Sequence, residues 1–314
     1  MDIRHAIGNT SMVRLRRLVP PGCAEILVKL EWENPTGSLK DRMAEAVIGR
    51  AEQDGRLKPG DTVVEYTGGS TGASLALICA AKGYRLHIVT SDAFSPEKLD
   101  QMVALGAQLT LVPSEGGLTT RKLILDMIET ARHLSREPHR YWTDQLNNHD
   151  SIAGYHALGE EIWRQTDGAV DAFVHCVGTG ASSRGVAVAL KRHKPSIEIV
   201  AVEPAESSVL LGGPAGPHKI EGVGIGYTPP LWDPTLGGRH PGRQDGRRQG
   251  HGAAPRPRGG AVRGDVFRGE RRRGDPSGAA AGAESDRRHA DGRLGAEVPQ
   301  HRRVPEAVRA TRAA

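Results

Sequence analysis

Short apolar runs alternate with segments of helical periodicity along residues 1–236, and this alternation constrains the fold more than any other feature. The apolar runs are typical of buried strands and lie at 26–29, 62–65, 86–90, 109–112, 172–177 and 197–202. Apolar residues at i, i+3 and i+4 spacing predict helices at 38–53, 71–82, 96–105, 121–134, 152–165 and 183–192. Strand–helix alternation of this kind predicts an α/β fold with parallel sheets covered by helices.

The pattern stops after Leu236, where residues 237–314 have a different composition. Gly, Ala, Arg and Pro make up 52 of these 78 residues, and 18 Arg occur without one Lys. Such a segment cannot bury enough apolar surface to offset the entropy of ordering it, so we expect a disordered tail.

GC-rich coding DNA that is read out of frame explains the same composition. The Asp265 codon must be GAY and the Val266 codon GTN, so a reading displaced by one nucleotide gives Met or Thr. In this displaced frame, residues 264–276 are compatible with GTSSGANVVAAI, 287–304 with TVVTLMADSGLKYLSTDV and 237–262 with VDDILAVKTDDAKAMARRLAREEGLF. Three long, well-patterned matches in one frame indicate that the tail is frameshifted.

The positive charge of the chain lies in this tail. Residues 1–236 hold 24 Lys+Arg and 28 Asp+Glu, a balance of −4, whereas residues 237–314 hold 18 and 9, a balance of +9. On the frameshift hypothesis these arginines form no binding motif, and we predict no nucleic-acid partner. A nucleic-acid binder with a basic tail is the alternative, and it predicts salt-sensitive DNA binding that disappears on truncation at residue 236.

The apolar runs, the N-terminus and the cysteines predict the cellular location of the protein. There is no run of about 18 apolar residues, and the N-terminus lacks the apolar stretch of a secretory signal, so we predict neither a membrane span nor export. Three cysteines show no metal-binding spacing, which predicts free thiols, a cytoplasmic protein and no metal site. They are Cys23, Cys79 and Cys176.

Lys40 is the candidate nucleophilic lysine. It lies in the segment NPTGSLKDR at 34–42, where Pro35 and Gly37 predict a turn and Ser38 is a plausible N-cap for the following helix. A lysine in the first helical turn is disfavoured by the helix dipole, which would lower its pKa and favour imine formation. A surface lysine is the alternative for this residue in isolation.

Two small-residue loops follow predicted strands and open predicted helices. TGGSTG at 67–72 and GTGAS at 178–182 would let backbone N–H groups converge on an anion at a helix N-terminus. Neither loop has the full GxGxxG dinucleotide pattern or the P-loop lysine, so neither NAD nor ATP is favoured. A phosphate cradle without a lysine is compatible with pyridoxal 5'-phosphate (PLP).

Taken together, these segments resemble the cysteine synthase (O-acetylserine sulfhydrylase) and cystathionine β-synthase family of PLP-dependent enzymes. The resemblance begins with IGNT at 7–10 and covers nearly everything to Leu236; it includes SPEK at 95–98, QLNN at 145–148 and the specific segment GPHKIEGVG at 216–224. It implies PLP fold type II, which is tryptophan synthase β-like, with two domains and a three-layer αβα arrangement. The larger, PLP-binding domain would contain residues 1–39 and 146–236, and the smaller α/β domain residues 40–145.

The resemblance also implies roles for the matched residues. Lys40 would form the Schiff base with PLP and act as acid and base at the substrate Cα. The cofactor would further contact Ser70 and the phosphate loop Gly178, Thr179, Gly180, Ala181 and Ser182. The amino-acid substrate would contact Thr67, Gly68, Thr71, Gln145 and Gly222. The implied reaction is a β-replacement that forms L-cysteine from an activated serine and sulfide through an aminoacrylate, in a homodimer.

The chain departs from the family pattern at three places. Ser70 stands where the family has the Asn that bonds the PLP 3′-oxygen, and Ala181 replaces a phosphate-loop Gly. The serine that holds the pyridine nitrogen belongs to GTSSGAN, which only the displaced frame encodes. The alternatives are therefore a cystathionine β-synthase-like, dehydratase-like or diaminopropionate-synthase-like enzyme that uses the same Lys40, or a catalytically dead frameshifted product.

Overall fold

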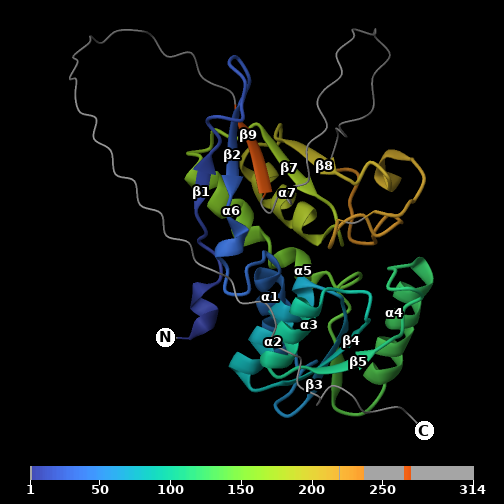
Figure 1. Ribbon diagram of the computed structural model, residues 1–314. Helices are drawn as coiled ribbons and strands as arrows, with labels where there is room; N and C mark the ends of the chain where they lie inside the picture. The colour runs from blue at the N-terminus through green and yellow to red at the C-terminus, as the bar shows by residue number, and fades with distance from the viewer. Residues whose placement is uncertain (1, 219, 237–264, 270–314) are drawn as a thin grey trace, which may run out of the picture. The chain divides into compact units, whose positions relative to one another are not determined.

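The computed structural model describes residues 2–218 and 220–236 in full and the backbone of residues 265–269. These residues belong to one compact unit, Met1–Arg272, in which the described strands form two sheets (Figure 1). The five-stranded sheet has the order β1 (Met12–Arg14), β2 (Glu25–Lys29), β9 (Asp265–Gly269), β7 (Ala172–Cys176) and β8 (Glu198–Val202). The four-stranded sheet has the order β5 (Gln108–Leu111), β4 (Arg85–Thr90), β3 (Thr62–Tyr66) and β6 (Arg140–Trp142).

The α-helices of the described chain are α1 (Lys40–Gln53), α2 (Ser70–Lys82), α3 (Pro96–Ala104), α4 (Arg121–Ser135), α5 (Asp150–Ala153), α6 (His156–Gln165) and α7 (Ala181–His193). Short 3-10 helices lie at η1 (Ile3–Ala6), η2 (Glu31–Glu33) and η3 (Val209–Leu211). None of the helices in the described ranges is long and apolar enough to cross a membrane.

The four-stranded sheet is parallel throughout and is covered by helices on both faces. Because side chains alternate between the faces of a strand, Val63 packs into a cluster with residues of α1 and α2, whereas Val64 and Tyr66 pack into a second cluster with α4. Burial on both faces explains why the two central strands, β3 and β4, are mostly apolar in the sequence, whereas the outer strands β5 and β6 are only partly buried. The predicted three-layer arrangement is present at this sheet.

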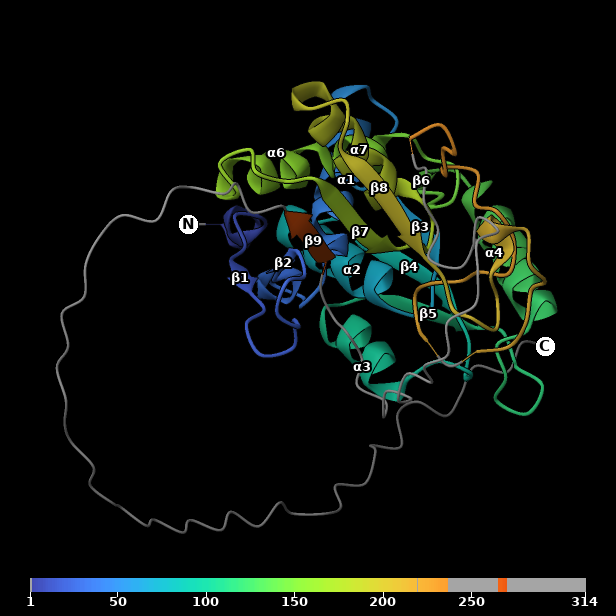
Figure 2. The same cartoon turned by 90° about the horizontal axis from the view of Figure 1, so that it is seen from above.

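The five-stranded sheet is mixed, which corrects the expectation of parallel sheets. β7 and β8 are parallel, but β1 is antiparallel to β2, and β9 is antiparallel to both β2 and β7. In both views β9 lies between β2 and β7 (Figures 1 and 2). Within the segment expected to be disordered, Asp265–Gly269 forms this strand, because the edges of β2 and β7 supply backbone partners that composition does not reveal. The rest of the predicted tail lies outside the described residues.

Two helix boundaries also differ from prediction. The single helix expected at 152–165 is two helices, α5 and α6, separated at Gly154 and Tyr155. A Cβ on Gly154 would lie 2.8 Å from the Arg42 carbonyl oxygen and from the Ala46 Cβ, so the bend brings the backbone directly onto α1. At α1 the N-cap is Leu39 rather than Ser38, although the Ser38 hydroxyl does accept a hydrogen bond from the Lys40 N–H (3.2 Å).

Candidate active site

Lys40 is the first residue of α1, and the turn before it is fixed by the carboxylate of Asp41. Asp41 accepts hydrogen bonds from the Thr36 N–H (2.8 Å), the Thr36 hydroxyl (2.5 Å) and the Ser74 hydroxyl of α2 (2.6 Å). Burial raises the pKa of Asp41, and these hydrogen bonds oppose the shift. The turn and α1 are therefore tied to α2, which holds the backbone of Lys40 in place.

The first turns of α1 are held from the other side by a buried ion network centred on Arg42. Its guanidinium contacts both carboxylate oxygens of Glu31 (2.7 and 2.8 Å) and both of Glu161 (2.6 and 2.8 Å). Lys29, which is fully buried, lies 2.8 Å from Glu161. Burial alone would raise the pKa of Glu161, but the bonds and charges of Arg42 and Lys29 lower it to about 2.

Residues 67–69 connect the end of β3 to α2, so the segment TGGSTG does join a strand to a helix, as the sequence predicts. Gly69 N–H donates to the Thr67 hydroxyl (3.2 Å), and α2 begins at Ser70. A Cβ on Gly69 would meet nothing within 4 Å, whereas a Cβ on Gly68 would lie 2.1 Å from the Phe94 ring. The loop is thus open at Gly69 and covered by an aromatic ring at Gly68.

The structure brings two of the predicted substrate-binding residues together. The Thr71 hydroxyl donates to Gln145 Oε1 (2.9 Å), and Gln145 Nε2 donates to the Tyr66 carbonyl oxygen (2.8 Å). Gln145 follows β6, and β6 pairs with β3 in parallel, so the carboxyl ends of both strands meet at one edge of the sheet. A polar pair at a helix N-terminus can bind a carboxylate.

The predicted cofactor loop follows β7 and opens α7. Gly180 has φ +87°, the left-handed region that favours glycine, and Ala181 is the first residue of α7. The Ser182 hydroxyl lies 2.8 Å from the Nε2 of His175 on β7. The Ser183 hydroxyl is buried and has no hydrogen-bond partner among the described residues. Unpaired N–H groups of the first helical turn together with a buried unpaired hydroxyl fit a bound phosphate.

The segment around Gly222 packs on this loop. A Cβ on Gly178 would lie 2.3 Å from the Gly222 carbonyl oxygen, and the Gly224 N–H donates to the Val177 carbonyl oxygen (3.1 Å). His218 fixes the same segment, because its Nε2 contacts the Gly224 carbonyl oxygen (2.8 Å). Gly222, predicted to contact the substrate, therefore lies against the predicted cofactor loop.

The contacts place the predicted residues in three groups: Lys40 on its turn, Thr67–Thr71 with Gln145, and Gly178–Ser182 with Gly222. That all three meet around one cofactor remains a prediction. Three residues that contact these groups, Glu65, His175 and Phe94, were not predicted from the sequence. Only a rare polar residue inside an apolar strand could have signalled the first two.

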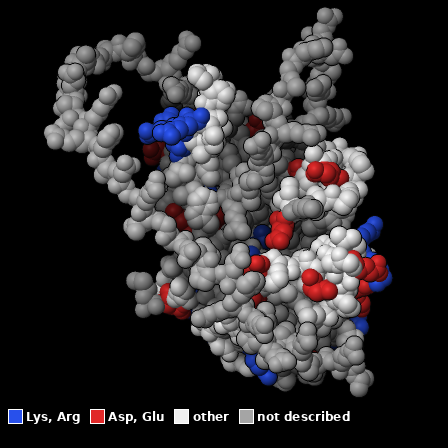
Figure 3. Space-filling model, viewed as in Figure 1, with Lys and Arg blue, Asp and Glu red and all other residues white. Residues whose placement is uncertain are grey.

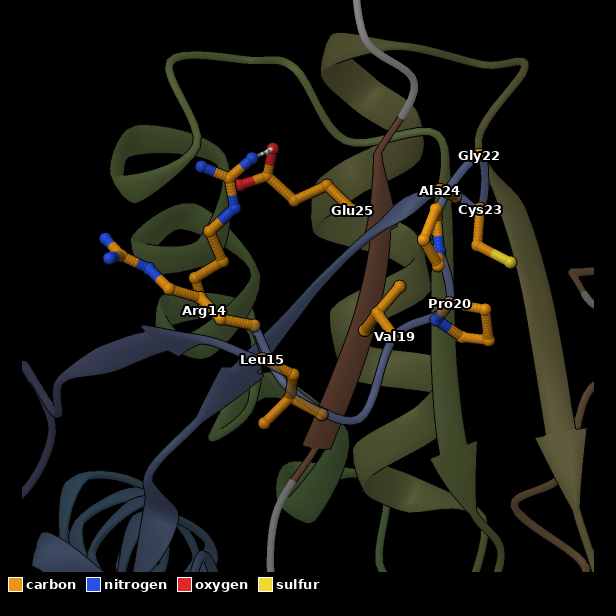
Figure 4. Close-up of a pocket in the computed structure, with 10 residues that line it drawn as sticks. Arg14, Leu15, Val19, Pro20, Gly22, Cys23, Ala24 and Glu25 are labelled. Carbon is orange, nitrogen blue, oxygen red and sulfur yellow. Dashed lines mark hydrogen bonds and ion pairs between the residues drawn. The ribbon is translucent and has the colours of Figure 1, made fainter.

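A separate cavity of 310 Å³ lies beside the β1–β2 hairpin and is lined by none of the predicted site residues (Figure 4). Arg14 and Glu25 form an ion pair of 2.6 Å at its edge, and Val19, Pro20 and Cys23 line it. Exposed arginines gather beside the end of β1 as a blue group in Figure 3. We assign this cavity no part in the candidate active site.

Comparison with known proteins gives consistent matches. The sequence profile of the pyridoxal-phosphate dependent enzymes matches residues 3–243. Cysteine synthase of Staphylococcus aureus is 42% identical over 231 residues, 73% of this chain and 72% of the relative. The crystal structure of cysteine synthase from Entamoeba histolytica aligns with a TM-score of 0.69 and 37% identity over 76% of this chain and 71% of that one. The crystal structure of O-ureido-L-serine synthase aligns with a TM-score of 0.69 and 34% identity over 76% of this chain and 74% of that one. The predicted family resemblance, the fold type II α/β architecture and the PLP cofactor are confirmed.

Proposed function

The chain belongs to the family of pyridoxal-phosphate dependent enzymes, and on that premise we propose that it forms L-cysteine from an activated serine and sulfide by β-replacement. The observation that carries this proposal is the hydrogen-bonded pair Thr71–Gln145 at the N-terminus of α2, in a chain 42% identical to a cysteine synthase. The pair supplies polar groups for the carboxylate of an amino acid.

Lys40 is the residue that we propose to hold the cofactor and to move the proton at the substrate Cα. Bound PLP supplies an electron sink for the carbon from which this proton leaves. Thr67, Thr71 and Gln145 orient the substrate by its carboxylate, so that the Cα–H bond faces Lys40. Loss of the α-proton allows the leaving group to depart from Cβ, sulfide then adds at Cβ, and Lys40 returns a proton to Cα.

The cofactor phosphate would lie at the N-terminus of α7. The residues present there fit a phosphate, because the Ser183 hydroxyl is buried without a partner among the described residues and the loop is glycine-rich. Ala181 lies within the first turn, where its backbone N–H is still available. We propose that Ser70, the first residue of α2, also contacts the cofactor.

The activated serine and the nucleophile define the main alternatives. A cystathionine β-synthase-like, dehydratase-like or diaminopropionate-synthase-like activity would use the same Lys40 with another leaving group or nucleophile. Solved structures similar to this chain include a hydrogen sulfide-producing enzyme of Fusobacterium nucleatum at 35% identity, as well as O-ureido-L-serine synthase. A panel of O-acetylserine and serine with sulfide, homocysteine or ammonia separates these activities by product.

We further propose a cytoplasmic homodimer, and light scattering of the purified protein tests the dimer. We also propose that residues 237–314 are translated out of the family's frame; a catalytically dead frameshifted product is the alternative to the active enzyme. Resequencing the gene around the Leu236 codon tests the frameshift, since an intact reading frame at that codon would exclude it.

The decisive experiment is a visible absorption spectrum of the full chain purified with added PLP. The lysine-bound cofactor absorbs in the visible range, so we expect a band that Lys40→Ala abolishes and that shifts when the amino-acid substrate is added. A wild-type protein without this band, or a Lys40→Ala variant that keeps it, would exclude Lys40 as the cofactor lysine.

A further inference from the structure

Glu65 is a fully buried carboxyl group at the end of β3, two residues before Thr67. Its Oε2 accepts hydrogen bonds from the Thr143 hydroxyl (2.5 Å) and the Gln145 N–H (2.9 Å), and its Oε1 accepts one from the Tyr66 N–H (2.9 Å). Two of these three donors are backbone N–H groups, which cannot accept a proton in return. Both Glu65 oxygens, Oε1 and Oε2, therefore act as acceptors, as they do in an ionised carboxylate.

This arrangement costs free energy. Burial raises the pKa of Glu65 to about 7, and the hydrogen bonds from Thr143, Gln145 and Tyr66 only partly oppose the shift. A buried apolar side chain would avoid this desolvation cost, so the carboxylate is a poor choice for stability alone. Its contacts indicate what it does instead, because two of them hold the segment that begins at Thr143 and leads to Gln145.

Gln145 is in turn held at both ends. Its backbone N–H binds Glu65, while its side-chain amide donates to the Tyr66 carbonyl oxygen (2.8 Å) and accepts from Thr71 (2.9 Å). One N–H of the Gln145 amide is thereby used, and the orientation of the second is set by the first. Moving the Gln145 backbone would change the direction of this second N–H and of the Thr71 hydroxyl together.

We propose that Glu65 is a positioning residue for the amino-acid substrate, because it fixes Gln145 in the orientation in which the second N–H of the Gln145 amide meets the substrate carboxylate. Glu65 acts through Gln145 and does not touch the substrate. The inference rests on the proposed function, in which Thr71 and Gln145 bind that carboxylate.

Three variants of the full chain test the proposal. Glu65→Leu removes both acceptors, and Glu65→Gln keeps one acceptor oxygen, so it can serve either the Tyr66 N–H or the Gln145 N–H but not both. Asp61→Asn is the matched control: Asp61 is also a buried carboxyl, but it lies just before β3, at the other end of the strand, and accepts from the Lys58 N–H (2.8 Å). Thermal unfolding of each variant shows which of them fold.

We expect Glu65→Leu to raise KM for the amino acid about tenfold, the equivalent of one hydrogen bond, with kcat changed by less than about twofold. Glu65→Gln should raise KM by about threefold, and Asp61→Asn should leave it unchanged. If Glu65 acts only through Gln145, then Glu65→Leu combined with Gln145→Ala should be no worse than Gln145→Ala alone. Additive effects in the double variant, or equal KM changes in Glu65→Leu and Asp61→Asn, would overturn the proposal.

Amide hydrogen exchange without substrate gives a readout that needs no activity. Peptides that contain the Gln145 N–H should exchange faster in Glu65→Leu than in the wild type, by about tenfold, and at the wild-type rate in Asp61→Asn. Unchanged exchange in Glu65→Leu would overturn the positioning role even if the wild type makes cysteine. Faster exchange in a wild-type chain that makes no product would support the positioning of Gln145 and count against the proposed function alone.

Discussion

Replacing Arg42 by methionine should lower the free energy of unfolding more than the same substitution at any other arginine that the structure describes. The Arg42 side chain is only 3% exposed and makes four hydrogen bonds to carboxylates, two to Glu31 and two to Glu161, and a fifth, longer one to the Thr10 hydroxyl (3.4 Å). The methionine side chain would fill most of the volume but leave both carboxylates without this cation. Breaking a buried pair in this way costs about 3–5 kcal/mol, because a buried charge loses its compensation.

The two carboxylates are not affected equally. Glu161 keeps Lys29 at 2.8 Å and the Asn9 N–H at 2.9 Å, so part of its compensation remains. Glu31 keeps the neutral donors of the Thr10 hydroxyl (2.6 Å) and the Asn34 amide (3.0 Å). We therefore expect most of the loss to come from Glu31, and adding Glu31→Gln to Arg42→Met should restore part of the stability.

Urea unfolding at pH 7, followed by circular dichroism, measures the free energy of unfolding of each variant. Arg56→Met is the matched control, because Arg56 also contacts two acidic residues, Asp54 (2.8 Å) and Asp150 (2.6 Å), but is 41% exposed. Its loss should be too small to separate from the wild type. If Arg42→Met costs less than about 1 kcal/mol, or no more than Arg56→Met, the network does not hold α1 as we argue.

Three further predictions concern the site. Burial raises the pKa of Glu65 to about 7, so the folded protein holds this proton more tightly than the unfolded chain, whose pKa is about 4.5. The free energy of unfolding should therefore be highest below pH 4.5 and fall by about 3 kcal/mol as pH rises through 7. Unfolding experiments across pH 4–8 should show this decline in the wild type and not in Glu65→Gln. Gly68→Ala should destabilise the protein by about 1–3 kcal/mol, since its Cβ would lie 2.1 Å from the Phe94 ring, and Phe94→Ala should relieve most of that loss in a thermal melt. Ser183→Ala should weaken PLP binding about tenfold in a fluorescence titration without lowering the melting temperature of the cofactor-free protein, because its buried hydroxyl lacks a partner among the described residues; unchanged PLP affinity would remove Ser183 from the phosphate site.

The longer elements could be predicted from the sequence because their periodicity is strong. β4 and α4 each lie within one residue of the predicted bounds at either end, and the loop 67–72 does connect a strand to a helix. The three-residue strands β1 and β6 were missed, since three residues cannot establish a period of two. The break between α5 and α6 was missed because it depends on the approach of Gly154 to α1, which is a tertiary contact.

The candidate site shows the same division. Lys40 and the loops could be found from short motifs that are contiguous in the sequence. The partners that hold them could not, because Glu65 contacts Gln145 across 80 residues and Arg42 contacts Glu161 across 119. Such pairs depend on which strand ends meet, and strand order is not encoded by any local pattern.

The two sheets differ in the sequence separation of their strands. All four strands of the parallel sheet come from residues 62–142, whereas the mixed sheet joins strands that begin at Met12 and end at Gly269. During synthesis all strands of the parallel sheet can therefore pair as soon as β6 has left the ribosome. The strands β2 and β7 lack a partner on one edge until β9 has been synthesised. In the interval both strands present one open backbone edge, so we expect this half of the nascent chain to be the more prone to aggregate.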